Sequence, residues 1–100
     1  MKWVRSDGCK IPIKSWCQDV EESAMEQVIR LANHPAIVMH VALMPDCHAG
    51  MGMPIGGVIA CDNAIIVNAV GVDIGCGVVS AKTDMYVDDV TVDDVKLVLK

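Results

Sequence analysis

The sequence predicts an α+β fold in which a mixed, mostly buried β-sheet packs against a few helices. Two observations indicate this class: short runs rich in β-branched residues alternate with two stretches of helical periodicity, and 53% of the 100 residues are hydrophobic. The chain contains no Phe, so its core must be aliphatic. Because a domain of about 100 residues leaves a large share of its surface in water, we expect some of this apolar surface to contact further protein.

The first elements predicted along the chain are a strand and a helix. Residues 11–16 (IPIKSW) alternate between apolar and polar, as a short strand does. Asp19 precedes the helical stretch 20–33 as a candidate N-cap, and Asn33 and Pro35 predict its end. The buried face of this helix is predicted from the spacing of Met25, Val28, Ile29 and Ala32.

Three strands and a long loop are predicted to follow. Residues 36–44 (AIVMHVALM) form a nearly continuous apolar run, which is typical of a strand buried on both faces. The stretch 45–57 is rich in Gly and Pro and predicts a loop. Residues 58–60 and 64–67 predict a hairpin that turns through residues 62–63.

The last part of the chain is predicted to contain two more strands and a helix. Residues 69–72 and 78–83 are rich in β-formers. Thr91 and Asp94 have the spacing of a capping box and predict a helix over the residues that follow. No end signal follows this helix before Lys100, so we expect the chain to be part of a longer protein.

The overall charge and the cysteine usage narrow the class of protein. The net charge is −5 and the basic residues form no stripe, which argues against nonspecific nucleic-acid binding by this segment itself. The five cysteines form no CxxC pair and no signal peptide precedes them, so we expect reduced thiols and a cytoplasmic location. The apolar runs are shorter than the roughly 20 residues of a membrane span, so no membrane partner is expected.

The stretch AVGVDIGCG, residues 69–77, carries the first group of chemistry-bearing residues. An apolar strand ends there in Asp73 and Cys76, with glycines around them that let other groups approach closely. A carboxylate and a thiolate aimed at one point form half of a metal site, which on bare chemistry suits zinc or another borderline transition metal. A buried cysteine beside a turn aspartate is the alternative interpretation.

A second group lies at the end of the buried strand predicted above. Asp46 and His48 are two residues apart there, where active-site groups tend to lie in mixed folds, although a turn Asp and a surface His have the same pattern. Cys47 between them is predicted to pack into the core. His34 is expected at the end of the helix, and His40 is expected to be a buried histidine with its hydrogen bonds satisfied.

These residues belong to two longer motifs. MPDCHAGMGMPIGGVIA (residues 44–60) and IIVNAVGVDIGCG (residues 65–77) together resemble the N-terminal signature of the RtcB family of RNA-splicing ligases. The similarity extends upstream through IKSW and a helix that ends near a proline, so it covers nearly the whole chain. Since complete family members are several times longer, the resemblance implies that residues 1–100 are the N-terminal part of a single RtcB-like catalytic domain, without a separate linker.

The resemblance implies an RNA ligase that acts in tRNA splicing or RNA repair. Enzymes of this family join an RNA 3′-phosphate, or a 2′,3′-cyclic phosphate after opening it, to a 5′-hydroxyl. They use GTP and two manganese ions, and a histidine forms a covalent guanylate before GMP moves to the RNA. The resemblance thus implies manganese (Mn2+) as the cofactor, GTP as the co-substrate and RNA as the partner.

The same resemblance implies roles for individual residues. Asp73 and Cys76 match metal ligands of the family, in which the cysteine sulfur bridges both metals. Asp46 and His48 match the family's PDxH, for which we expect hydrogen-bond support of the metal ligands. No catalytic residue is expected in this chain, because the nucleophilic histidine, the remaining metal-binding histidines and the guanine pocket lie beyond residue 100 in the family.

Two other interpretations stay open at this point. One is a noncatalytic metal-binding module that uses Asp73, Cys76 and His48 in a dimer, and the other is a truncated product without its own activity. In every case we expect residues 1–100 alone to lack ligase activity and to self-associate through uncovered apolar strands.

Overall fold

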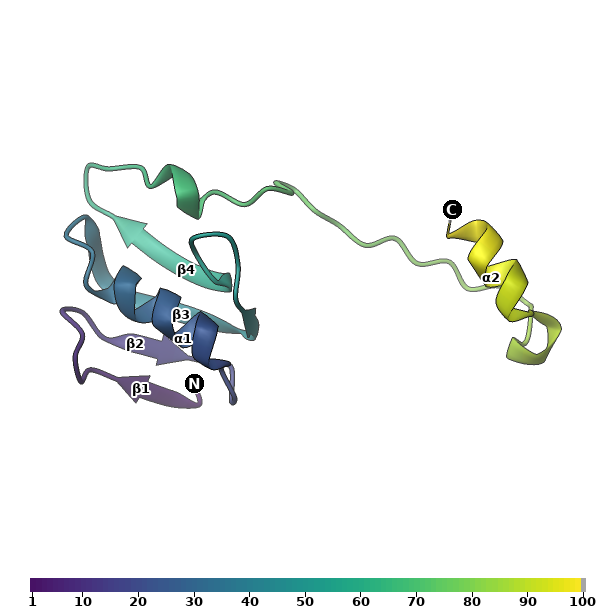
Figure 1. The fold of residues 1–100 in the computed structure, drawn as a ribbon, viewed down its shortest axis with the longest axis horizontal. Helices are drawn as coiled ribbons and strands as arrows, with labels where there is room; N and C mark the ends of the chain where they lie inside the picture. Colours follow the sequence, from purple (N-terminus) through teal and green to yellow (C-terminus); the bar gives the residue numbers. More distant parts are fainter. Residues whose placement is uncertain (100) are drawn as a thin grey trace.

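The computed structural model describes residues 1–99, which form a four-stranded mixed sheet, two α-helices and two short 3₁₀ helices (Figure 1). In chain order the elements are β1 (Trp3–Arg5), β2 (Ile13–Ser15), α1 (Glu22–Ala32), β3 (Ile37–His48), β4 (Ile55–Cys61), η1 (Val67–Ala69), η2 (Val87–Asp89) and α2 (Val92–Val98). This architecture confirms the predicted α+β class.

The strands lie in the sheet in the order β1-β2-β3-β4. β1 and β2 are antiparallel, β2 and β3 are parallel, and β3 and β4 are antiparallel. Parallel neighbours need a crossover connection, and α1 supplies it between β2 and β3. α1 packs against these two strands and covers one face of the sheet (Figure 1).

The core lies between α1 and the two central strands. Its fully buried hydrophobic side chains include Ile13 of β2, Val28 of α1, and Val41 and Leu43 of β3. Burying one such side chain contributes about 1.5–3 kcal/mol of hydrophobic stabilisation. Ser15 is also fully buried, and its hydroxyl is satisfied because it donates to the Cys17 backbone oxygen over 2.7 Å.

The two ends of α1 differ in how well the sequence predicted them. The N-cap is Glu21, so the prediction of Asp19 was wrong. The C-cap is Asn33, as predicted, and its side-chain oxygen accepts a hydrogen bond from the Lys10 backbone N–H over 3.0 Å. This bond ties the end of α1 to the segment that enters β2.

The buried face of α1 is rotated relative to the prediction. The buried residues are Ala24, Val28, Leu31 and Ala32, whereas Met25 and Ile29 are only partly buried. Two of the four buried residues are alanines, one near each end of this face.

The predicted hairpin between residues 58–60 and 64–67 was wrong. β4 pairs with β3, and residues 64–67 form no strand in the described part of the chain. β3 runs on to His48, so the connecting loop is limited to residues 49–54. β3 is also not buried on both faces throughout, because Met39 is 70% exposed.

After η1 the chain leaves the sheet as an extended arm that ends in η2 and α2 (Figure 1). Residues 69–72 and 78–83 were predicted as strands, but neither pairs with another strand among residues 1–99. Val78 and Val79 are 96% and 97% exposed. The arm therefore carries β-forming side chains without a partner strand.

The capping box of α2 is confirmed. The Thr91 hydroxyl accepts a hydrogen bond from the Asp94 N–H over 3.2 Å, and the Asp94 carboxylate accepts one from the Thr91 N–H over 2.9 Å. Hydrogen bonds from Thr91 lower the pKa of Asp94. No helix within residues 1–99 is long and apolar enough to cross a membrane.

Candidate functional site

The end of β3 departs from regular pairing with β4. The register shifts between Leu43 and His48, so residues 44–47 lie opposite Gly56 alone. Pro45 lacks an N–H and is tolerated in such an irregular stretch, where no ladder bond is required of it. Bulges re-aim side chains and are frequent beside active sites, so this stretch is a candidate place for a site.

Alternation along this stretch confirms the predicted placement of its side chains. Asp46 and His48 are exposed, whereas Cys47 between them is buried. Burial raises the pKa of the Cys47 thiol, which keeps it protonated and makes it a packing residue. His34 follows the C-cap of α1, as predicted. His40 is only half-buried within β3, so the prediction that it is buried was wrong.

The His48 ring is oriented by the backbone of its own strand. Its Nδ1 lies 2.8 Å from the Asp46 backbone oxygen. A carbonyl oxygen only accepts hydrogen bonds, so Nδ1 carries the proton and donates it. In the neutral ring this leaves the lone pair on Nε2, which is free to accept a hydrogen bond or to bind a metal.

Gly56 allows β4 to approach Asp46 closely. Its φ is +75°, and a Cβ built there would lie 3.0 Å from the Asp46 Oδ1 atom and 3.2 Å from the Cys47 backbone nitrogen. A side chain at this position would therefore be strained by the positive φ and would also overlap with the bulge. Gly56 thus fixes how closely the Asp46 carboxylate and β4 can pack.

Gly56→Ala tests this contact. We expect it to lower the free energy of unfolding by about 2–4 kcal/mol, because strain at positive φ and steric overlap with the bulge add together. Gly8→Ala is the control, because Gly8 has a φ of +70° but no atom within 4 Å of the place that a Cβ would take. Chemical denaturation followed by circular dichroism measures both losses, and equal losses would contradict the close approach of β4 to Asp46.

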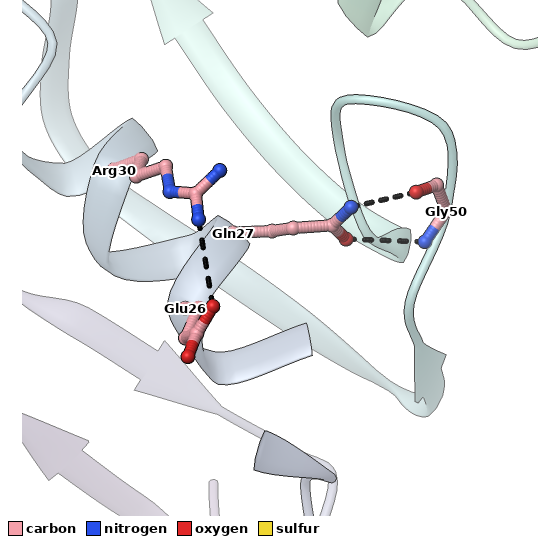
Figure 2. Close-up of polar contacts among 4 residues, drawn as sticks. All are labelled: Glu26, Gln27, Arg30 and Gly50. Atoms are coloured by element: carbon pink, nitrogen blue, oxygen red, sulfur yellow. Dashed lines mark hydrogen bonds and ion pairs between the residues drawn. The ribbon is translucent and has the colours of Figure 1, made fainter. Parts of the chain in front are cut away.

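The turn that follows β3 is held by two side chains of the α1 region. The Ala49 N–H donates to the Glu21 carboxylate over 2.6 Å. The Gln27 amide makes two hydrogen bonds to Gly50, one in each direction (Figure 2). Neither residue was predicted to hold this turn. Gln27 lies three residues after buried Ala24, and a polar side chain at a position on the apolar face of a helix is a signal that could have indicated it.

Asp73 and Cys76 lie in a turn of the extended arm. The Cys76 N–H donates to the Asp73 backbone oxygen over 3.2 Å, and Gly75 between them has a φ of +77°. Both residues are exposed and Cys76 is a free thiol. The alternative of a buried cysteine is therefore wrong for residues 1–99, and thiol and carboxyl are accessible to an approaching group.

The donor set of this turn fits a metal ion as a partial site. A thiolate and a carboxylate are both anionic ligands, and Gly71 and Gly77 have no atom within 4 Å of the position of a Cβ, so the space around the pair is open. Residues 1–99 contain no group of three or more His, Cys, Asp or Glu side chains that could hold a metal ion. The described residues therefore do not bring Asp46 and His48 together with Asp73 and Cys76.

One family of known proteins matches a stretch that includes both groups of residues. The family model described as "tRNA-splicing ligase RtcB" matches residues 27–100, which include both of them. The chain belongs to the RtcB family. The RNA-splicing ligase RtcB of Escherichia coli (strain K12) is 46% identical over 80 residues, which are 78% of this chain and 20% of that relative.

Two archaeal RtcB proteins show the same pattern. The tRNA-splicing ligases RtcB of Methanococcus maripaludis and Archaeoglobus fulgidus are 42% and 40% identical over 77 and 76 residues. These residues are 74% and 73% of this chain and 16% of each relative. The chain thus spans a fifth or less of the length of the RtcB relatives it matches.

Proposed function

We propose that the complete protein is an RNA ligase that joins an RNA 3′-phosphate or 2′,3′-cyclic phosphate to a 5′-hydroxyl, with GTP as co-substrate and two manganese ions as cofactors. The observation that carries this proposal is the RtcB match over residues 27–100, which contains both predicted site motifs. The names of the relatives, RNA-splicing and tRNA-splicing ligase, favour RNA ends as the substrate. A cytoplasmic location is part of the proposal, because an exposed thiol such as Cys76 stays reduced there.

In this proposal Asp73 and Cys76 hold manganese. Chemical and steric observations support this assignment. Both side chains are exposed, both become anionic ligands, and the neighbouring glycines leave open space around them. The bound ions would neutralise phosphate charge and orient the transferring groups. The remaining ligands and the nucleophilic histidine belong to residues outside this chain, so His34 and His40 have no catalytic role in the proposal.

Asp46 and His48 are proposed to support the metal ligands by hydrogen bonding. The His48 Nδ1–H is already engaged by the Asp46 backbone oxygen, so its Nε2 is the atom available to accept a hydrogen bond from a metal-bound water. The Asp46 carboxylate lies on the exposed side of the bulge and can accept hydrogen bonds in the same region.

The decisive experiment uses the complete protein, manganese and GTP labelled in the α-phosphate. We expect a covalently labelled protein band and, with a nicked stem-loop RNA bearing 2′,3′-cyclic phosphate and 5′-hydroxyl ends, a joined product. An RNA with a 3′-hydroxyl and a 5′-phosphate is the control and should not be joined. Joining of the control ends with no protein label would contradict the proposed chemistry.

Asp46→Ala and His48→Ala should each weaken manganese affinity or ligation by roughly 10–100-fold without abolishing it, as loss of hydrogen bonds to metal ligands does. His34→Ala, an exposed histidine outside the bulge, is the control and should leave both unchanged. Equilibrium dialysis and initial ligation rates measure the two effects. A crystal structure with manganese bound directly to His48 Nε2 would show that this residue is a ligand instead.

A further inference from the structure

The turn after the Asp46–His48 stretch is clamped to α1 by one side chain. The Gln27 Nε2 donates to the Gly50 backbone oxygen over 2.6 Å, and the Gly50 N–H donates to the Gln27 Oε1 over 3.1 Å. Figure 2 shows the Gln27 side chain reaching from the helix to the turn with both bonds on the same residue. One amide thus satisfies both backbone polar groups of Gly50, which are partly buried and costly to leave unpaired.

Gly50 has little freedom to rearrange once it is clamped. A Cβ at this position would collide with the Met53 backbone oxygen and lie 3.3 Å from the Ile55 backbone nitrogen. The turn is therefore folded tightly on itself before β4 begins. The adjacent Ala49 N–H is held by Glu21, so the α1 region fixes two consecutive residues of the turn.

The clamped turn directly follows one predicted site segment and lies against the residue that precedes the other. On its N-terminal side it follows His48 directly, with only Ala49 between His48 and Gly50. On its other side, a Cβ built on Gly52 would lie 3.3 Å from the Asn68 backbone oxygen, so the turn lies against η1. Asn68 immediately precedes residues 69–77, the stretch that carries Asp73 and Cys76.

We propose that Gln27 is a positioning residue: by clamping Gly50 it fixes the turn that sets Asp46 and His48 relative to the segment leading to Asp73 and Cys76. This inference rests on the proposed function in assigning a metal centre to these residues. Gln27 itself touches neither substrate nor metal in this account, and acts only through the backbone of the turn.

Two variants of Gln27 separate its hydrogen bonds from its size. Gln27→Met keeps an unbranched side chain of similar length but removes both bonds. Gln27→Glu can still accept from the Gly50 N–H but cannot donate to the Gly50 oxygen. Both leave the Gly50 oxygen unpaired, so both should loosen the turn.

Two neighbours on the same helix serve as matched controls. Glu26→Gln removes only an exposed ion pair to Arg30, with an N–O distance of 3.4 Å (Figure 2). Ile29→Ala removes partly buried packing against the core and leaves the two hydrogen bonds from Gln27 to Gly50 in place. The second control lowers stability, so it distinguishes a positioning role from a general loss of stability.

The measurements use the complete protein titrated with Co²⁺, whose thiolate charge-transfer absorption reports ligation by Cys76. We expect about 10-fold weaker Co²⁺ affinity in Gln27→Met and Gln27→Glu, and no change in Glu26→Gln or Ile29→Ala. Hydrogen exchange at residues 49–53 should speed up in the Gln27 variants alone, and the His48 imidazole NMR signals should shift. Equal affinity in Gln27→Met and Ile29→Ala would overturn the inference.

The same experiment distinguishes an incorrect role of Gln27 from an incorrect proposed function. If the unsubstituted protein gives no Co²⁺–thiolate absorption, the metal centre at Cys76 is wrong. In that case the hydrogen-exchange rates of residues 49–53 and the His48 NMR signals still test whether Gln27 positions the turn. Unchanged values in Gln27→Met would overturn the role of Gln27, and changed values would support it.

Discussion

Cys76→Ser in the complete protein is expected to abolish guanylation and RNA joining while leaving the fold intact. A serine hydroxyl stays neutral at physiological pH, whereas the metal ligand of a cysteine is its thiolate. Within residues 1–99 Cys76 is exposed in the arm and is not part of the core. Asp73→Ala should have the same effect because it removes the other proposed anionic ligand of the turn.

Cys9→Ser is the matched control, because Cys9 is also a free thiol that is not fully buried but lies near β1, far along the chain from the turn. It should retain guanylation. Labelled GTP measures the covalent guanylate, and elemental analysis measures bound manganese. Near-normal guanylation with full manganese content in Cys76→Ser would rule out Cys76 as a ligand.

Features encoded by neighbouring residues could be predicted from the sequence. The helix end at Asn33 and the capping box of Thr91 and Asp94 depend on contacts within a few residues, and the structure confirms both. The Asp73–Cys76 pair and the Asp46–His48 pair were likewise found as local motifs. The structure places the first pair in a turn and the second on a bulge.

Features that depend on distant pairing could not be predicted. Residues 78–83 have strong β propensity, yet a strand forms only against a partner, and residues 1–99 offer none. β3 continues through Pro45 because β4 pairs with it across the bulge. The Gln27–Gly50 clamp joins residues 23 positions apart, and it exists only because α1 crosses over the sheet.

Residues 1–100 expressed alone should form no covalent guanylate with GTP and manganese. Residues 1–99 provide no third His, Cys, Asp or Glu side chain close to Asp73 and Cys76. Any ion bound there would therefore be coordinated mostly by water. The proposed nucleophile is also outside this chain, so no acceptor for GMP is present. A labelled band at the mass of these 100 residues would contradict this expectation.

The same polypeptide should self-associate, because its apolar surface is not confined to the core. Residues directly opposite on neighbouring strands share a face, so Val4, Lys14, Ala42 and Val58 form one row on the face of the sheet away from α1. Val4 and Val58 are 49% and 53% exposed there. The arm adds Val78 and Val79, which are almost fully exposed and unpaired.

Size-exclusion chromatography with light scattering over a range of concentrations tests this prediction, and we expect oligomers that grow with concentration. Val78→Lys with Val79→Lys should reduce association if the arm drives it, and Val58→Lys should do so if the open sheet face drives it. The exposed Glu26→Lys substitution, which also removes the ion pair to Arg30, controls for added positive charge away from these surfaces. A stable monomer at all concentrations would show that water, and not further protein, covers these apolar side chains.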